Sequence, residues 1–329
     1  MDLPDLMSAA YIDTLGGAGS IRFGDLPVPE PAAAEVLVRM EASEVNHVDL
    51  FVRSGAFPTP LPFPFVIGRD LVGTVVAVGE AVAEFSPGDR VWSNSLGHDG
   101  RQGTFSEYVA APVERLYRLP DDITPAEAAP VLHAAGTAYI GLVREARLRP
   151  GETIVVGSAS GAVGTAIVEL AAAMGAHVIA GASTGDEEWV ADCGAATVID
   201  KHAGDFHRQV EQAAPGGVDV WWDPSGAYDF DRSVPLLAQG ARVIAMAGMQ
   251  AAPRLPLGQL YTRDASVLGF AISNASAADL AEAAQAINGM FATGRLRGRI
   301  GATFHLAEAA EAHRALEDGR VRGRILILP

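Results

Sequence analysis

The chain has 329 residues, of which 49% are hydrophobic and 19% charged, a balance that allows one or two substantial cores and argues against global disorder. Its formal net charge of −16 and sequence pI near 4.8 oppose binding to nucleic acid or anionic membranes, because Lys and Arg carry most of that binding. We therefore expect a folded two-domain protein that acts on a small molecule.

The N-terminal stretch MDLPDLMSAAYIDTLGG has acidic residues and prolines where a secretory signal would have basic residues and then an apolar run. The longest apolar stretches are broken by polar residues before they reach the roughly 20 residues that span a bilayer. Cys193 is the only cysteine, which excludes an intrachain disulfide and a multi-cysteine zinc site. These features predict a cytoplasmic protein without a transmembrane segment.

Residues 21–119 have the pattern of a largely β domain. Short β-branched runs such as EVLVRM and LVGTVVAVGE are separated by Pro and Gly turns such as SPGDRV. An Ala-rich helical stretch then follows, which begins with an Asp/Thr/Pro helix start. A second domain is predicted to begin near Ile123.

The second domain is predicted to consist of repeated strand–helix units. Strands are expected in ETIVVGSA, HVIAGAS, ATVID, VDVWWDPSG and ARVIAMAG, and helices in GAVGTAIVELAAAMG and DEEWVADCG. Such alternation predicts a parallel sheet covered on both faces, whose ligands bind at the carboxyl ends of the strands. Trp221 and Trp222 should point to opposite faces of that sheet as core residues. The tail predicts an amphipathic helix, a glycine stop and a closing strand that could complete either domain.

The turn after Val156 has the pattern of a dinucleotide-binding loop. Such a turn needs small residues for tight turning, for close approach to the pyrophosphate, and for packing of the helix on its strand. These positions fall at Ala159, Gly161 and Gly164, so the first glycine of the strict motif is absent. The helix that follows would present its positive N-terminus to phosphate.

The end of the next strand indicates which dinucleotide binds. An NAD site generally has Asp or Glu there to hold the ribose diol, whereas this chain has Gly181, Ala182 and Ser183. Ser183 and Thr184 could donate hydrogen bonds to a 2′-phosphate. The acidic residues 186–188 oppose that choice, so NADPH is favoured over NADH and NADH remains an alternative.

Several motifs in series resemble the medium-chain dehydrogenase/reductase superfamily, and within it the zinc-free quinone oxidoreductase branch of zeta-crystallin-like and enoyl-reductase proteins. They are VNHVDLFVRSG, VIGRDLVGTVVAVGEAVAEFSPGDRV, GTFSEYVAAPVERLYRLPDDIT, AAGTAY and GSASGAVG. The resemblance implies an α/β protein with a β-rich GroES-like catalytic domain (1–124 and 268–329), a Rossmann doubly wound parallel-sheet domain (125–267), and NADPH between them. It also implies a homodimer formed by edge pairing of a last strand at Ala265–Ile272.

Zinc members of the superfamily carry Cys where Asn46 stands and a His-Glu pair where Arg69 and Asp70 stand. We therefore expect no metal site. Without a Lewis acid to hold an alkoxide, hydride donation to a quinone or to a polarised C=C–C=O system is the accessible chemistry.

The resemblance also implies the site residues. Asn46 would lie near the nicotinamide ribose and the reacting carbonyl, and Asp49 would orient Asn46 or join a proton relay. An ordinary turn or helix-start role is the alternative for each. The residues expected to bind the cofactor are Asn46, Thr137, Ser158, Ala159, Gly161, Ala162, Val163, Gly164, Ser183, Thr184, Gly248 and Phe270.

One departure affects proton transfer. Family members commonly carry tyrosines after the VN motif, whereas this chain has Phe51 and Phe57, so no phenol is left there to donate a proton. Water, His47 or His133 would then have to supply it, although a structural role is the more common one for such histidines.

The prediction is an NADPH-dependent, zinc-independent oxidoreductase that transfers hydride to a quinone or an α,β-unsaturated carbonyl compound. A non-catalytic NADPH-binding stress or structural protein of the same fold is one alternative. An enoyl reductase acting on thioester-bound acyl chains is another. Arg320 and Arg324 are further candidates to approach the cofactor phosphates.

Overall fold

The computed structural model describes residues 3–329, and the chain divides into two compact units. Unit 1 comprises Met1–His133 and Ala277–Pro329, and unit 2 comprises Ala134–Ser276. The domain limits expected from the sequence, 124/125 and 267/268, stay a prediction about functional domains.

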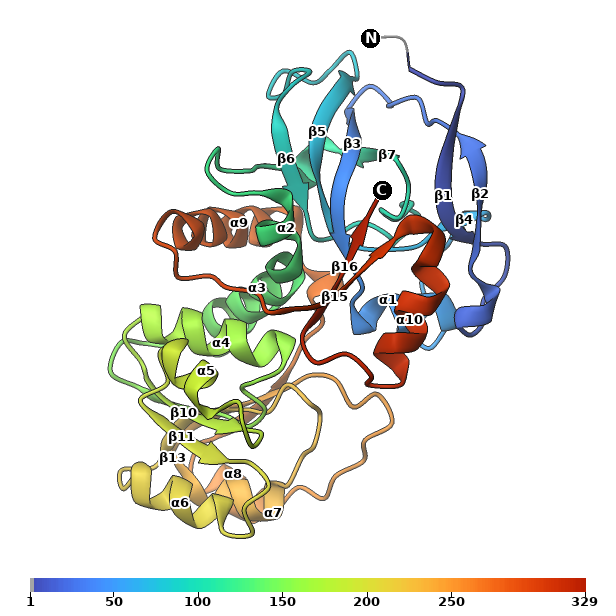
Figure 1. The fold of residues 1–329 in the computed structure, drawn as a ribbon. Helices are drawn as coiled ribbons and strands as arrows, with labels where there is room; N and C mark the ends of the chain where they lie inside the picture. The colour runs from blue at the N-terminus through green and yellow to red at the C-terminus, as the bar shows by residue number, and fades with distance from the viewer. Residues whose placement is uncertain (1–2) are drawn as a thin grey trace. The chain divides into compact units, whose positions relative to one another are not determined.

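Unit 1 is built mainly on antiparallel strands, and only β15 and β16 pair in parallel among its described strands (Figure 1). A small sheet has the order β2-β1-β4, and a seven-stranded sheet has the order β15-β16-β3-β5-β6-β8 with β7 paired to β3. These strands are β1 (Leu6–Ile12), β2 (Arg22–Pro27), β3 (Glu35–Glu44), β4 (Phe65–Val66), β5 (Leu71–Val78), β6 (Arg90–Ser93), β7 (Tyr108–Pro112), β8 (Tyr117–Arg118), β15 (Ile300–His305) and β16 (Arg324–Leu328). Its helices are α1 (His47–Ser54), α2 (Pro125–Ala128), α9 (Ala277–Ala292) and α10 (Ala309–Glu317).

The tail completes unit 1, which settles the alternative that the sequence left open. The amphipathic helix α10 ends before Gly319, whose φ of 61° lies in the left-handed region that glycine favours. The chain then forms β16, in which Leu326 pairs antiparallel with Glu44 of β3. The last five-residue strand therefore lies beside the strand that leads into Asn46.

Unit 2 contains a six-stranded parallel sheet in the order β11-β10-β9-β12-β13-β14. The strands are β9 (Thr153–Val156), β10 (His177–Ala182), β11 (Thr197–Asp200), β12 (Val218–Trp222), β13 (Leu237–Ala245) and β14 (Ser266–Gly269). The helices are α3 (Leu132–Tyr139), which starts at the end of unit 1, α4 (Ala162–Ala173), α5 (Glu187–Asp192), α6 (Phe206–Ala213), α7 (Phe230–Ser233) and α8 (Leu257–Tyr261). The predicted strand–helix alternation and parallel sheet are confirmed.

The paired tryptophans alternate as predicted. Trp221 stacks on His207 of α6, with ring centroids 5.7 Å apart and an interplanar angle of 7°. Trp222 is fully buried and meets Phe270 edge to face at 5.8 Å. A Cβ on Gly141 would lie 2.0 Å from the Trp222 ring, so glycine is what lets the π-helical end of the α3 stretch pass over this indole.

The last strand is shorter than the sequence predicted. We expected Ala265–Ile272, but β14 ends at Gly269 and Ile272 begins a 3₁₀ turn. The backbone leaves the sheet where Phe270 turns its ring onto Trp222. Side-chain packing therefore ends the strand before its apolar pattern ends.

Candidate functional site

In unit 1, Asn46 lies where β3 passes into α1, and its amide is held by a buried carboxyl group. Asn46 Nδ2 donates a hydrogen bond to Asp70 Oδ2 at 2.6 Å, and Asp49 Oδ2 accepts one from the Asn46 backbone N–H at 2.7 Å. Asn46, Asp49 and Asp70 are 8%, 4% and 0% exposed. The second N–H of the amide is available to a ligand oxygen. The structure therefore brings the two predicted catalytic residues together and adds Asp70 to them.

Burial changes the protonation of the carboxyl groups around Asn46. It raises the pKa of Asp49 to about 7, although the Asn46 N–H and two arginines oppose the shift. It raises the pKa of Glu44 to about 8, against the attraction of Arg324, whose Nη1 lies 3.2 Å from Glu44 Oε1. The pKa of Asp70 is also raised well above its usual range by burial, and by Glu44 and Asp49. Buried carboxyls that hold a proton near neutral pH are typical of functional sites.

Two of these residues were missed as site residues from the sequence. The sequence marks Asp70 only as a replacement for a zinc ligand, and Glu44 only as part of a β-rich stretch. Among residues 3–329, Asp70 Oδ1 and Glu44 Oε2 have no hydrogen-bond partner although both atoms are buried. The burial of these two carboxyl groups depends on how the strands pair, so it could not be predicted from the sequence.

Neither histidine is favoured as a proton donor. Desolvation and the charge of Arg324 lower the pKa of His47, at the start of α1, so its ring is mainly neutral at neutral pH. His133 is buried, and desolvation together with Arg69 and Arg324 lowers its pKa to about 3, so its ring is neutral at neutral pH and a poor acid. Phe51 and Phe57 are both half-buried.

In unit 2, the loop after β9 is built around small residues. The Ala159 N–H donates to Gly181 O at 2.8 Å, and Ala159 is fully buried. A Cβ on Gly164 would lie 2.0 Å from Ser158 O, whereas one on Gly161 would find no atom closer than 3.6 Å. Gly164 thus permits close helix–strand packing, and Gly161 leaves the N-terminal end of α4 open. This geometry fits a pyrophosphate group bound at the helix start.

The other predicted cofactor residues of unit 2 follow neighbouring parallel strands. Ser183 and Thr184 follow β10, Gly248 follows β13, and Phe270 follows β14. Because the strands are parallel, all of these lie at the carboxyl edge of the sheet, where the chain reverses strand order between β9 and β12. Thr137 is buried in α3.

Two further features of that edge were not predicted. Asp223, at the end of β12, lies over Gly157, where a Cβ would be 2.6 Å from its Oδ2. The turns at Gly226 and Gly248 touch, since a Cβ on Gly226 would lie 2.5 Å from the Gly248 nitrogen. The proximity of these separate segments follows from the strand order of the sheet, which the sequence motifs do not give.

The acidic residues after Ser183 are partly engaged by their own turn. The Asp186 N–H donates to Ser183 O at 2.9 Å and Asp186 is 4% exposed. Glu187 Oε2 accepts the Gly185 N–H at 2.7 Å. Ser183 is half-buried and Thr184 is exposed, so these two hydroxyls can meet a ligand at this edge.

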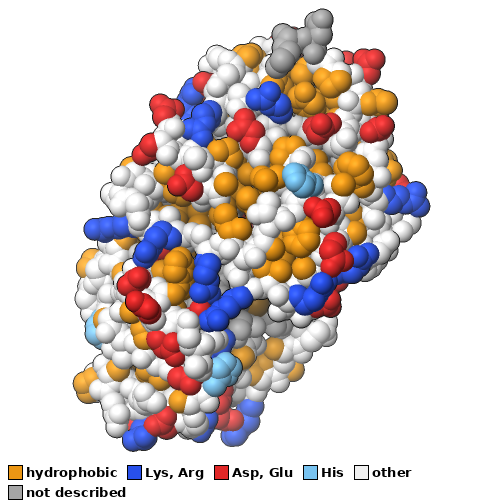
Figure 2. All heavy atoms as spheres, in the orientation of Figure 1, with side chains coloured by type: hydrophobic (Ala, Val, Ile, Leu, Met, Phe, Trp, Pro, Cys, Tyr) orange, Lys and Arg blue, Asp and Glu red, His pale blue; other side chains and the backbone are white. Residues whose placement is uncertain are grey.

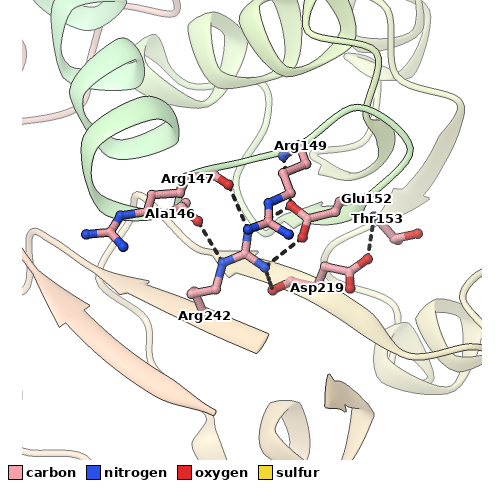
Figure 3. Close-up of polar contacts among 7 residues, drawn as sticks. All are labelled: Ala146, Arg147, Arg149, Glu152, Thr153, Asp219 and Arg242. Atoms are coloured by element: carbon pink, nitrogen blue, oxygen red, sulfur yellow. Dashed lines mark hydrogen bonds and ion pairs between the residues drawn. The ribbon is translucent and has the colours of Figure 1, made fainter. Parts of the chain in front are cut away.

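The opposite edge of the sheet has a hollow of about 590 Å³. Its main polar feature is Arg242, which donates to Glu152 at 3.0 and 2.7 Å and to three backbone oxygens of residues 146, 147 and 219 (Figure 3). All five guanidinium N–H groups are therefore used within the protein. Arg242, within β13, therefore links this strand to the start of β9 and to β12. It offers no donor to a ligand.

Arg320 and Arg324 both have carboxylate partners inside unit 1. Arg320 pairs with Glu311 at 2.8 Å and with Asp318 at 3.1 Å. Arg324 is 7% exposed and pairs with Glu44. Their role as phosphate ligands stays a prediction.

On the face drawn in Figure 2, acidic and basic side chains are interspersed instead of forming a patch of one sign. Within residues 3–329, no group of three or more His, Cys, Asp or Glu side chains is placed to hold a metal ion. In the same part of the chain, no helix is both long and apolar enough to cross a membrane.

Comparison with known proteins identifies two family signatures. Residues 32–121 match the alcohol dehydrogenase GroES-like domain, and residues 193–327 match the zinc-binding dehydrogenase family. The quinone oxidoreductase of Lama guanicoe is 29% identical over 327 residues, with 98% of each chain covered. The acryloyl-coenzyme A reductase of Metallosphaera sedula is 31% identical, with 91% of this chain and 93% of that protein covered.

Solved structures agree with these matches. An NAD-dependent alcohol dehydrogenase superposes with a TM-score of 0.88 at 32% identity, covering 98% of this chain and 100% of that one. A mycobacterial protein in complex with NADPH superposes with a TM-score of 0.84 at 29% identity, with the same coverage. The predicted fold class, a GroES-like domain with a parallel-sheet Rossmann domain, is confirmed.

Proposed function

Because the chain belongs to the medium-chain dehydrogenase/reductase superfamily of oxidoreductases, we propose that it is an NADPH-dependent, zinc-independent enzyme that reduces a quinone or an α,β-unsaturated carbonyl compound. The observation that carries the proposal is the loop between β9 and α4, whose small residues leave the helix start open to a phosphate. NADPH, when bound, supplies the hydride.

Unit 2 residues would bind the cofactor, chiefly through backbone. Ser158, Ala159 and the first turn of α4, Gly161 to Gly164, would donate N–H groups to the pyrophosphate. The hydroxyls of Ser183 and Thr184 would meet the 2′-phosphate. The NADPH-complexed relative supports this choice and the NAD-dependent one opposes it, so the two cofactors must be compared directly.

In unit 1, the free N–H of the Asn46 amide would donate to the acceptor carbonyl, where negative charge develops as hydride arrives. Asp70 fixes the amide orientation from one side, and Asp49 fixes the backbone from the other. A donor held in this way needs little reorganisation during the reaction. Asp49 would thus be a positioning residue for Asn46.

Zinc independence is also proposed from chemistry. Asn46 and Arg69 replace side chains that could bind zinc, and an arginine is a cation that opposes metal binding. Asn46 already donates a hydrogen bond to Asp70, so part of the hydrogen-bonding capacity of these two side chains is satisfied without a metal ion. The match to a family described as zinc-binding makes metal analysis of the purified protein a required control.

A homodimer is proposed for the assembly. β14 is the end strand of the parallel sheet and pairs only with β13 among the described strands. A second copy could extend the sheet there, because an open strand edge has unpaired backbone groups. Sedimentation analysis would test it, and a monomer at micromolar concentration would contradict it.

The test is to mix the purified protein with NADPH or NADH and with quinones, enones and enoyl thioesters. We expect oxidation of NADPH with at least one acceptor, and a larger thermal shift with NADPH than with NADH. Activity confined to thioesters would select the enoyl reductase alternative, which the acryloyl-coenzyme A reductase relative favours. Tight NADPH binding with no acceptor reduced would contradict the proposed catalysis.

A further inference from the structure

A second group of basic side chains in unit 1 has the composition of an anion-binding site. It contains Arg69 before β5, His98 and Arg101 between β6 and β7, and Arg115 after β7. Burial is the largest cause of the lowered pKa of Arg69, and Arg101 and Arg115 lower it further. Burial and the same three arginines lower the pKa of His98 to about 4. Backbone and side-chain bonds agree with this grouping, because the Leu96 N–H donates to Arg69 O at 3.3 Å and Arg115 Nη1 donates to Ser95 Oγ at 3.3 Å.

The backbone holds these groups in place. A Cβ on Gly97 would lie 2.4 Å from Gly68 O, so the segment that carries His98 packs directly against the turn that carries Arg69. The Asp99 N–H donates to Thr59 Oγ1 at 2.8 Å, which ties the same segment to the chain after α1. The backbone segments that carry Arg69, His98 and Arg101 are thus held together by packing and hydrogen bonds.

The protein neutralises Arg101 and Arg115 only weakly. Among residues 3–329, Arg115 forms no ion pair with a carboxylate within 4 Å, and its Nη1 donates to Ser95 Oγ at 3.3 Å. Arg101 pairs with Asp99 at 3.6 Å, but the Asp99 side chain is 68% exposed, so water screens that attraction. The exposed Glu114 is the other carboxylate that acts on Arg101.

Two buried atoms of the cluster lack a hydrogen-bond partner among the described residues. They are Nδ1 of His98 and Nε of Arg101. A buried polar atom without a partner costs free energy, so a ligand that supplied an acceptor would be favoured. Phe57 stacks on His98 with ring centroids 5.5 Å apart, which places an apolar ring beside the charged groups.

We propose that Arg69, His98, Arg101 and Arg115 bind a carboxylate or phosphate group carried by the electron-accepting substrate. Arg69 precedes Asp70, which holds Asn46, and the charge of Arg69 also acts on Asp49. Arg69 therefore lies one residue from the carboxyl group that holds Asn46, and we infer that one substrate contacts both the cluster and the amide. The inference rests on the proposed function and narrows its substrate to an acidic quinone or enone, with Phe57 against the apolar part.

The first test measures ion binding without turnover. Inorganic phosphate and succinate are titrated calorimetrically into the full-length wild type, Arg115→Gln, Arg101→Gln and a control, Arg118→Gln. Arg118 lies three residues beyond Arg115 but pairs with Asp89 at 3.0 Å. We expect the wild type and the control to bind one ion, and the other two variants to bind it about 10- to 100-fold more weakly, the value of a charge-assisted hydrogen bond. The ion that binds shows which group the substrate carries.

The second test compares a neutral enone with the same enone carrying that anion. In Arg115→Gln the ratio of kcat/KM for the anionic acceptor to kcat/KM for the neutral acceptor should fall about 10- to 100-fold. In Arg118→Gln this ratio should stay unchanged. No ion binding by the wild type, or equal binding by a correctly folded Arg115→Gln, would overturn the proposal. If the wild type reduces neither acceptor, the proposed function fails while the titration still decides on the anion site.

Discussion

In unit 2 the residues expected to hold the cofactor are small and act through backbone, whereas in unit 1 those expected to act on the substrate are charged or polar and buried. A Cβ added at Gly164 would strike a backbone oxygen, while the Asn46 amide is held by a carboxyl group with no exposure. Phosphate is a strong acceptor that an array of N–H groups satisfies. A developing negative charge on carbon-bound oxygen needs a fixed donor instead. Adding atoms in unit 2 should therefore reduce stability or cofactor binding, whereas removing a side chain in unit 1 should reduce the reaction rate.

The largest effect is expected from adding one methyl group in unit 2. Gly164→Ala places a Cβ 2.0 Å from Ser158 O and 2.8 Å from the Ala159 Cα, and neither backbone atom can move freely. We expect the free energy of unfolding to fall by about 3 kcal/mol, at the upper end for overpacking. Urea denaturation measures this loss.

The matched control is Gly161→Ala in the same loop. Its nearest atom would be 3.6 Å away, so the free energy of unfolding should change by less than about 1 kcal/mol. The new methyl group would face the proposed phosphate position, and NADPH should bind about tenfold more weakly. Equal destabilisation by both variants would refute the distinction between packing and binding glycines.

Removing a side chain in unit 1 should affect rate more than folding. Asn46→Ala deletes the amide that donates to Asp70. We expect kcat/KM to fall about 100-fold, the usual loss when one preorganised donor is removed. Steady-state kinetics with an accepted substrate measures it.

Asn288→Ala serves as control, because that amide bonds Trp92 Nε1 at 3.1 Å in the same unit and belongs to no proposed site. It should retain kcat/KM while losing some stability. If both variants kept full activity, Asn46 would have only its turn-forming role, which was the structural alternative.

The buried carboxyls of unit 1 should also give a pH dependence of stability that unit 2 lacks. Glu44 has a folded pKa near 8, above its usual 4.5, so the native state binds a proton that the unfolded state has released. The contribution of Glu44 to stability then falls as pH rises toward 8, by about 1.4 kcal/mol per pH unit at most, and the raised pKa values of Asp49 and Asp70 add to the slope. The buried histidines with lowered pKa act below pH 6.5, so the measurement runs from pH 7 to 8.

Glu44→Gln should make this slope smaller, since glutamine does not titrate and still offers Arg324 an acceptor. Denaturant unfolding at several pH values compares the two proteins. The same slope in both would mean that Glu44 is ionised in the native state.

The difference between the units also explains what could be predicted from sequence. The loop of unit 2 is local, because its strand, its three small residues and its helix all lie within residues 153–173. The small side chains of Ala159, Gly161 and Gly164 can be read directly from the sequence. Trp221 and Trp222 were assigned to opposite faces because alternation is a property of any strand. The predicted end of the last strand was wrong, because it depends on a side chain distant in sequence. β14 ends at Gly269, and the next residue, Phe270, packs on Trp222.

The contacts of unit 1 are not local. Asn46 and Asp70 are 24 positions apart and meet because β3 pairs antiparallel with β5. Glu44 is buried because β16, from the far end of the chain, pairs beside it. The sequence identified Asn46 and Asp49 through a motif, but the carboxyls that set their electrostatics depend on strand register, which the motif does not contain.

The smallest effect is expected from changing cofactor preference at Ser183, which tests whether unit 2 uses any side chain for binding. Ser183→Asp puts a carboxylate after β10, where it would repel a 2′-phosphate and could accept from the ribose diol of NADH. The ratio of the NADH to the NADPH dissociation constant should fall about tenfold. Ser183→Ala removes the hydroxyl without adding charge, which weakens NADPH binding alone, so the same ratio should fall about threefold. Titration by cofactor fluorescence measures both, and an unchanged ratio in both would leave backbone groups as the whole of the unit 2 site.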